Sequence, residues 1–79
     1  MLTLRYFAAA RAAAGTTQES IVASTLDEAL ALAVDRHGPD LGRVLTACSF
    51  LVDGLAAPDR EATVPDGAVI DVLPPFAGG

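Results

Sequence analysis

The strongest structural signal in the sequence is one amphipathic helix near the middle of the chain. Thr25 is a favourable N-cap, and Glu28, three positions later, completes the pattern of a capping box. Apolar residues then recur at helical spacing, at Leu26, Ala29, Leu30, Ala33 and Val34. Gly38 and Pro39 predict the end of the helix. A single helix with one apolar face cannot form a core alone, so the rest of the chain must supply the opposing surface.

The segments on both sides of this helix favour β-strands. Alternating apolar and polar residues predict a first strand over 2–7, in which Leu2, Leu4 and Tyr6 face the core. Further strands are predicted over 19–22, 49–52 and 68–73, with a short returning strand over 55–57. An Asp-Gly pair at 53–54 has the composition of a hairpin turn.

Two shorter helical segments are also predicted. The alanine-rich stretch 8–14 favours a helix, and Gly15 is expected to end it. After the main helix, the apolar residues Leu41, Val44 and Leu45 predict one further helical turn.

The order is therefore strand, strand, helix, strand, short strand, strand. A hairpin, a crossover helix and further strands indicate an α+β fold, in which one main helix packs on one face of a small mixed sheet. This is the β-grasp architecture of ubiquitin-like domains, in which the first and last strands lie side by side. We predict one such domain over 1–73 and a separate C-terminal tail over 74–79.

The tail has an unusual combination of stiff and permissive residues. Its sequence is Pro74, Pro75, Phe76, Ala77, Gly78 and Gly79. Proline lacks the N–H that a paired strand needs, so the two prolines favour an extended exit from the sheet. Glycine has no side chain, which leaves the carboxylate of Gly79 sterically open and lets the tip enter a narrow channel. Chain ends are often disordered for no functional reason, so the tail alone leaves function and simple fraying equally open.

One face of the predicted sheet is expected to stay free of helices. Strand alternation places Phe7, Leu51 and Leu73 on this face, with Asp71 beside them. An exposed apolar patch on a small protein usually marks a protein interface. A shift of one residue in register would instead bury these side chains.

Composition narrows the possible partners. The 79 residues include 10 acidic and 5 basic side chains, for a net charge of −5, and every basic residue is arginine. This balance argues against nucleic acid and favours a partner with a basic groove. The absence of lysine excludes a Walker-type phosphate loop. No apolar run is long enough for a membrane span, and no convincing signal peptide is present, so we expect a cytoplasmic protein without membrane contact.

Cys48 and His37 are the candidate reactive groups of the sequence. One cysteine and one histidine exclude a zinc site built only from these residue types, and no metal site is expected. Cys48 has no basic neighbour in sequence that would lower the pKa of its thiol, so we interpret it as a partly buried small residue. His37 is expected to lie near the negative end of the helix dipole, although a pair with Cys48 stays open.

Several segments match a known family. They are Tyr6-Phe7-Ala8-Ala9-Ala10-Arg11, Gly15-Thr16, Thr25-Leu26-Asp27-Glu28-Ala29-Leu30, Asp66-Gly67 and the tail 74–79. Through them the whole chain resembles the MoaD family, the small sulfur-carrier subunit of molybdopterin synthase. The terminal Gly-Gly alone is less specific, because carriers of the thiamine and cysteine pathways and ubiquitin-like modifiers share it.

The resemblance implies a carrier that is not an enzyme on its own and binds no cofactor. A MoeB-like partner would use ATP to adenylate the carboxylate of Gly79, and a sulfur donor protein would convert it to a thiocarboxylate. Residues 74–78 would insert into a MoaE-like large subunit, which supplies the catalytic residues. There the carrier would give sulfur to cyclic pyranopterin monophosphate, in a heterotetramer of two small and two large subunits. The family pattern also favours a role for Arg11, either in partner contact or in an ion pair with a nearby acidic residue. We group it with Phe7, Leu51 and Leu73, which strand alternation places on the open face, as the predicted partner interface. A cysteine- or thiamine-pathway carrier and a ubiquitin-like modifier remain alternatives.

Overall fold

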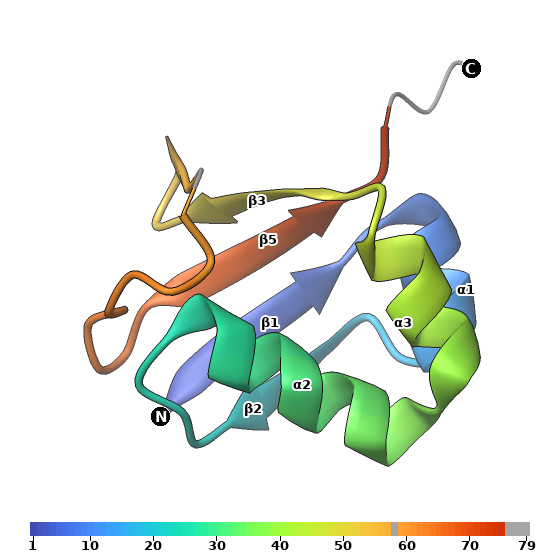
Figure 1. The fold of residues 1–79 in the computed structure, drawn as a ribbon, viewed down its shortest axis with the longest axis horizontal. Helices are drawn as coiled ribbons and strands as arrows, with labels where there is room; N and C mark the ends of the chain where they lie inside the picture. Colours follow the sequence, from blue (N-terminus) through green and yellow to red (C-terminus); the bar gives the residue numbers. More distant parts are fainter. Residues whose placement is uncertain (58, 76–79) are drawn as a thin grey trace.

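The computed structural model describes residues 1–57 and 59–75, and the structural statements below refer to these residues. The elements, in chain order (Figure 1), are β1 (Leu2–Tyr6), α1 (Ala8–Ala14), β2 (Gln18–Ile21), α2 (Leu26–His37), α3 (Pro39–Leu45), β3 (Ser49–Val52), β4 (Leu55–Ala56) and β5 (Val69–Leu73).

The strands form one mixed sheet in the order β2-β1-β5-β3-β4. β1 pairs parallel with β5, whereas β1–β2, β5–β3 and β3–β4 are antiparallel. The first and last strands therefore lie side by side within the sheet, and the predicted α+β, β-grasp fold is confirmed. Because β5 is central, it meets β1 on one side and β3 on the other.

The core lies between the sheet and the helices. In Figure 1, α2 crosses in front of the sheet, while α1 and α3 pack against each other at one end. The predicted inward residues Leu2, Leu4 and Tyr6 are buried, as are Ile70 and Val72 of β5. The helices contribute Ala10, Leu26, Ala29, Leu30, Ala33, Leu41 and Leu45 to the same core. The strand registers predicted from alternation are therefore confirmed at these positions.

The start of α2 follows the sequence pattern closely. The Thr25 hydroxyl accepts a hydrogen bond from the Glu28 N–H at 3.1 Å, and the Glu28 carboxylate accepts from the Thr25 N–H at 3.2 Å. The predicted capping box is present, so two N–H groups at the helix start have partners. Gly15, in a left-handed conformation with φ of 74°, ends α1 as predicted.

Several element boundaries differ from the sequence prediction. β2 covers 18–21 instead of 19–22, and Val22 lies beyond it, 74% exposed. The single turn expected after the main helix is the seven-residue helix α3, which begins at Pro39. Proline suits the first turn of a helix, because its fixed φ is helical and its missing N–H would have had no partner there. β5 begins at Val69, one residue later than predicted, and β4 ends at Ala56, one residue earlier.

Within the described residues, none of the helices is both long and apolar enough to cross a membrane.

Candidate functional site

The sheet ends directly before the two prolines. β5 stops at Leu73, which pairs with Ser49 of β3, and Pro74 and Pro75 follow. The strand stops where proline removes the N–H that the next ladder bond would need. Residues Phe76, Ala77, Gly78 and Gly79, to which the sequence assigned the reactive tip, lie outside the described residues. Their predicted roles, and the division into a domain and a tail, stay predictions.

Leu51, Leu73 and Phe7 lie on the sheet face opposite the helices and are called here the open-face patch. Leu51 pairs with Asp71, and Leu73 follows Asp71 by two residues, so both point to the same side. Phe7 directly follows β1 in an extended conformation and continues its alternation. Its side chain is 38% exposed, while Leu51 and Leu73 are partly exposed. The predicted patch therefore exists as a surface, and its role as an interface stays a prediction.

An ion pair lies beside this patch. Arg5 of β1 pairs in register with Asp71 of β5. Arg5 Nε donates to Asp71 Oδ1 at 2.6 Å and Arg5 Nη2 donates to Asp71 Oδ2 at 3.0 Å. These hydrogen bonds and the carboxylate charge raise the pKa of Arg5 above its ordinary value. The guanidinium also lies 5.8 Å from the centre of the Phe7 ring, which is within cation–π range.

Asp71 lies on the open face of the sheet, as predicted, but its side chain is not exposed to solvent there. It is only 9% exposed, since Arg5 covers it, whereas the Arg5 side chain is 46% exposed. A guanidinium has five N–H donors, and Asp71 engages two of them. The others can donate to a carboxylate or carbonyl oxygen of a partner. Arg5 was not among the predicted site residues, although its position opposite Asp71 follows once β1 and β5 are paired in parallel.

Arg11 lies on α1, one helical turn after Phe7. The Phe7 carbonyl accepts hydrogen bonds from the N–H groups of Ala10 and Arg11. Residues four apart share one side of a helix, so Arg11 extends the surface that starts at Phe7. Ala10 and Ala14 face the core, and Arg11 is exposed. Among the described residues it forms no ion pair, so its charge is available to a partner.

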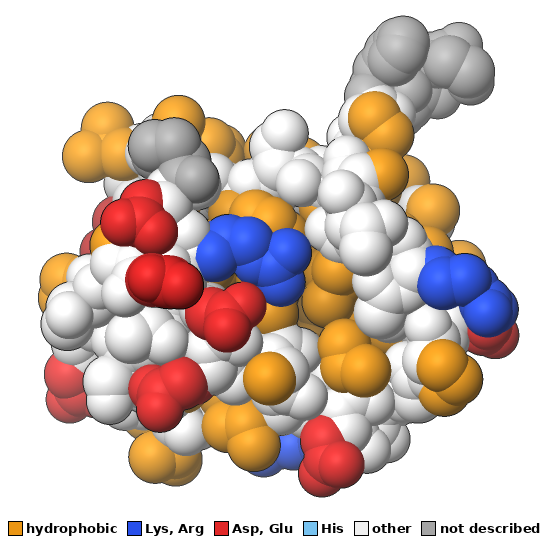
Figure 2. All heavy atoms as spheres, viewed as in Figure 1, with side chains coloured by type: hydrophobic (Ala, Val, Ile, Leu, Met, Phe, Trp, Pro, Cys, Tyr) orange, Lys and Arg blue, Asp and Glu red, His pale blue; other side chains and the backbone are white. Residues whose placement is uncertain are grey.

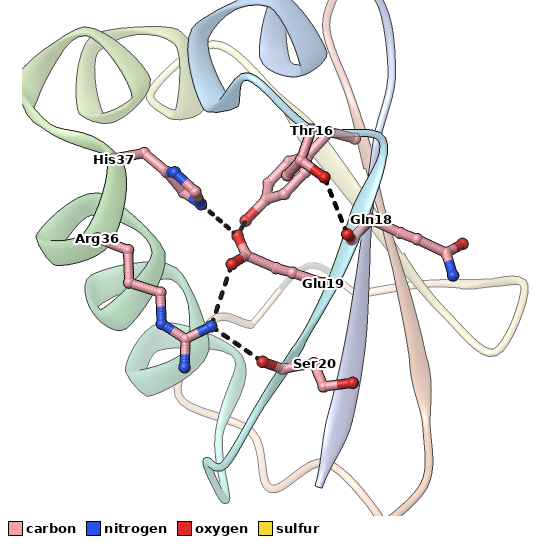
Figure 3. Close-up of polar contacts among 7 residues, drawn as sticks. Thr16, Gln18, Glu19, Ser20, Arg36 and His37 are labelled. Atoms are coloured by element: carbon pink, nitrogen blue, oxygen red, sulfur yellow. Dashed lines mark hydrogen bonds and ion pairs between the residues drawn. The ribbon is translucent and has the colours of Figure 1, made fainter.

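Figure 3 shows a second polar cluster, on the helix side of the sheet, centred on Glu19 of β2. Glu19 Oε2 accepts a hydrogen bond from the Tyr6 hydroxyl at 2.5 Å and lies 2.6 Å from His37 Nε2. Arg36 Nη1 donates to Glu19 Oε1 and to the Ser20 carbonyl, each at 3.0 Å. The cluster joins the last turn of α2 to an edge strand, which is a structural role.

The Glu19 cluster changes the ionisation of its members. Burial alone would raise the pKa of Glu19, but the hydrogen bonds from Tyr6, His37 and Arg36 outweigh it and lower that pKa. Burial, followed by the hydrogen bond to Glu19, raises the pKa of Tyr6 well above its ordinary value. His37 lies in the last turn of α2, as predicted, but its contact with Glu19 could not be predicted, since nothing local links positions 19 and 37.

Cys48 has the environment of a structural residue. Its thiol is partly buried and donates to the Val44 carbonyl at 3.2 Å, and burial raises its pKa. A reactive cysteine needs the opposite shift, toward thiolate. The possible pair with His37 is not formed, because the His37 ring contacts Glu19.

Comparison with protein families gives one match over nearly the whole chain. The model of the ThiS family matches residues 4–79. A comparison with curated protein sequences found no matching relative.

Solved structures share the fold over the full length. The small archaeal modifier protein 1 of H. volcanii is 27% identical with a TM-score of 0.72, over 95% of this chain and 97% of that one. A complex of subunits 1 and 2 of the molybdopterin-converting factor from Helicobacter pylori 26695 contains a chain that is 23% identical, with a TM-score of 0.72, over 99% and 97%. The BexX/CysO complex of Amycolatopsis orientalis contains one that is 21% identical, with a TM-score of 0.80, over 100% of both chains. The last two are similar in fold alone.

Proposed function

The chain belongs to the ThiS family of small ubiquitin-like sulfur carriers, and we propose that it carries sulfur for molybdopterin synthesis as a thiocarboxylate on Gly79. In this proposal the protein acts in the cytoplasm as the small subunit of a molybdopterin synthase. A MoaE-like large subunit supplies the catalytic residues, and two small and two large subunits form the active assembly.

The observation that carries the proposal is the continuity between the open-face patch and the tail. Leu73 belongs to the patch, is the last residue of β5 and directly precedes Pro74. A partner that covers Leu73, Leu51 and Phe7 therefore receives the chain end in a fixed direction, because the prolines favour an extended exit. Arg5 and Arg11 lie beside the apolar contact and are suited to acidic groups or carbonyl oxygens of that partner.

The chemistry of the carboxylate explains why partners are needed. An α-carboxylate has a pKa of about 3.5, so it is anionic at neutral pH and resists nucleophiles. A MoeB-like enzyme attaches AMP from ATP to it with release of pyrophosphate, and a sulfur donor protein then displaces AMP. Gly79 ends up as a thiocarboxylate, and cyclic pyranopterin monophosphate accepts its sulfur.

One observation favours the molybdopterin pathway over the others. The block from Tyr6 to Arg11 resembles the MoaD family more specifically than the terminal Gly-Gly does. The shared fold does not separate the pathways, because the chain of the H. pylori molybdopterin-converting factor complex and the chain of the BexX/CysO complex both have it. A role as a protein modifier is the second candidate, since the archaeal modifier protein is 27% identical.

Reconstitution tests the proposal. The protein is prepared with a Gly79 thiocarboxylate and mixed with a MoaE-type large subunit and the pyranopterin precursor, and molybdopterin is measured. The same protein with an ordinary carboxylate is the matched control. We expect product only with the thiocarboxylate. No product, with the thiocarboxylate intact and the large subunit active with its own carrier, would reassign the protein to the cysteine or thiamine pathway. A mass increase on a partner lysine in the presence of the activating enzyme would instead indicate a modifier.

A further inference from the structure

A pocket on the helix side of the sheet has no role in the function proposed so far. It has a volume of about 370 Å³ and lies between the end of α3, the start of β3, β4 and Arg60. Cys48, Ser49 and Phe50 contribute to its wall. In Figure 2 this face shows a basic side chain lying over hydrophobic ones, with acidic side chains to one side.

Arg60 gives this pocket its charge. Its guanidinium carbon lies 5.5 Å from the centre of the Phe50 ring. The Arg60 carbonyl accepts a hydrogen bond from the Asp27 N–H at 2.7 Å, which ties the loop around Arg60 to the start of α2. The position of the guanidinium is thus set by a stacking contact on one side and a backbone contact on the other.

The hydrogen-bonding capacity of Arg60 is not used up. Its Nε is buried and has no hydrogen-bond partner among the described residues. The Asp27 carboxylate is an ion-pair neighbour at 3.6 Å, which is too long for a hydrogen bond. The side chain as a whole is 42% exposed, so an incoming oxygen can reach the exposed part of the guanidinium although Nε itself is buried. A guanidinium in this state favours a carboxylate, which can accept two parallel N–H groups.

The start of the tail lies next to this pocket. β3 runs antiparallel to β5, so Ser49 in the pocket wall is the register partner of Leu73. Six residues follow Leu73, and fully extended they span at most about 20 Å. Neighbouring strands are only about 4.8 Å apart, so the chain end can reach the pocket without crossing the sheet. It brings an aromatic side chain at Phe76 and a carboxylate at Gly79.

We propose that residues 76–79 dock into the pocket of their own chain, with the Gly79 carboxylate paired to Arg60. The inference deepens the proposed function, because the docked group is the same carboxylate that the partners activate. A half-exposed ion pair is weak, and the exposed Asp59 and Glu61 beside Arg60 weaken it further. Docked and free tails therefore coexist. A partner that binds the open-face patch and the tail shifts this equilibrium towards the free tail.

Nuclear magnetic resonance of the free protein tests this. Backbone amide shifts of the full chain are compared with those of a chain that ends at Ala77. We expect shift differences at Ser49, Phe50 and Arg60, together with slowed motion of Gly79 in the full chain. In Arg60→Gln these tail-dependent differences should be lost, whereas Arg43→Gln, an exposed arginine outside the pocket, should keep them.

A second variant controls for the possibility that Arg60→Gln changes the fold itself. A full chain whose Gly79 ends in a carboxamide keeps Arg60 but removes the charge, and its pocket shifts should resemble those of the truncated chain. Unchanged pocket shifts after truncation would overturn the proposal, as would shift differences that depend on protein concentration, which would indicate the tail of a second copy. No activating enzyme or sulfur is present, so failure here leaves the sulfur-carrier proposal intact, and failed reconstitution leaves docking intact.

Discussion

Arg5 and Asp71 are register partners across the parallel β1–β5 pair, and their side chains form a two-point ion pair beside the open-face patch. The pair has two consequences. It fixes the two central strands to each other at the level of the patch, and it presents the remaining guanidinium donors to whatever covers that patch.

Replacing Asp71 with alanine should lower the free energy of unfolding, because Arg5 loses its hydrogen-bonded partner. Since the guanidinium is partly exposed, the ionic part of the loss should shrink at high salt. Urea unfolding at low and high salt measures both effects. Asp35→Ala, which removes an exposed carboxylate of α2, is the control. An equal loss in both variants would mean that the Arg5 pair contributes nothing specific.

Leu73→Asp should weaken binding to the large subunit while the fold survives. A charge placed at the centre of an apolar contact loses its hydration on binding, and we expect a cost of about 2 kcal/mol or more. Phe7→Ala should weaken binding by a similar amount. Calorimetric titration of the large subunit gives the affinities, and Val22→Asp, an equally drastic change at an exposed residue off the patch, should bind normally. Affinities unaffected by both patch variants would exclude this surface as the interface.

Tyr6→Phe should destabilise the protein by about 1.5 kcal/mol, because it removes a hydrogen bond to the ionised Glu19 carboxylate in a mostly buried setting. Thermal or urea unfolding measures the loss. Thr16→Val removes an exposed hydroxyl with one backbone partner and should cost clearly less. The prediction fails if the two losses are the same.

The low pKa of Glu19 gives stability a defined dependence on pH. The pKa of Glu19 is lower in the folded state, so the unfolded state binds the proton more readily. The stabilising contribution of the ionised Glu19 to the free energy of unfolding is therefore fully present above the ordinary Glu pKa of about 4.3. It is lost as pH falls through the lower folded value. The stability difference between wild type and Glu19→Gln should therefore narrow as pH falls from 7 through about 4 and below. The N-terminal amine lowers the pKa of Asp66. Asp66 is present in both proteins, so its effect on the pH dependence of stability cancels in this comparison. A difference that widens on acidification would contradict the assignment.

Removing Gly79 should abolish activation by the MoeB-like enzyme, because the shortened chain presents its carboxylate one residue too early. The thermal midpoint should stay unchanged, since the last residue of the described core is Val72 and β5 ends at Leu73. Mass spectrometry after incubation with ATP and the sulfur donor detects the thiocarboxylate. Thiocarboxylation of the shortened chain, with full activity, would remove the special role of Gly79.

The sequence predicted the features that depend on neighbouring residues. The capping box at Thr25 and Glu28 lies within one helical turn, and the inward positions of Leu4 and Ile70 follow from alternation along single strands. Gly38 and Pro39 follow the end of α2 as predicted, but Pro39 also begins α3. The length of α3 was not predicted, because apolar spacing marks only the buried side of so short a helix.

The polar contacts could not be predicted in the same way. Arg5 and Asp71 are 66 positions apart, and Glu19 and His37 are 18 apart. Each pair depends on strand order, register and helix placement together, so a one-residue error in any of these removes the contact. Arg60 was missed for the same reason, because its place above Phe50 depends on the contact of its loop with α2.

The pairing of β1 with β5 also has a consequence for biosynthesis. A ribosome releases β1 first and β5 last. The pairing of these two adjacent inner strands of the sheet can form only when both have been synthesised. Contacts between such distant segments make folding slower than in a protein of local contacts. A chain interrupted before β5 lacks Leu73 and Asp71, and so has neither a completed sheet nor a complete open-face patch. Synthesis of the final strand therefore completes the fold and this patch in a single event.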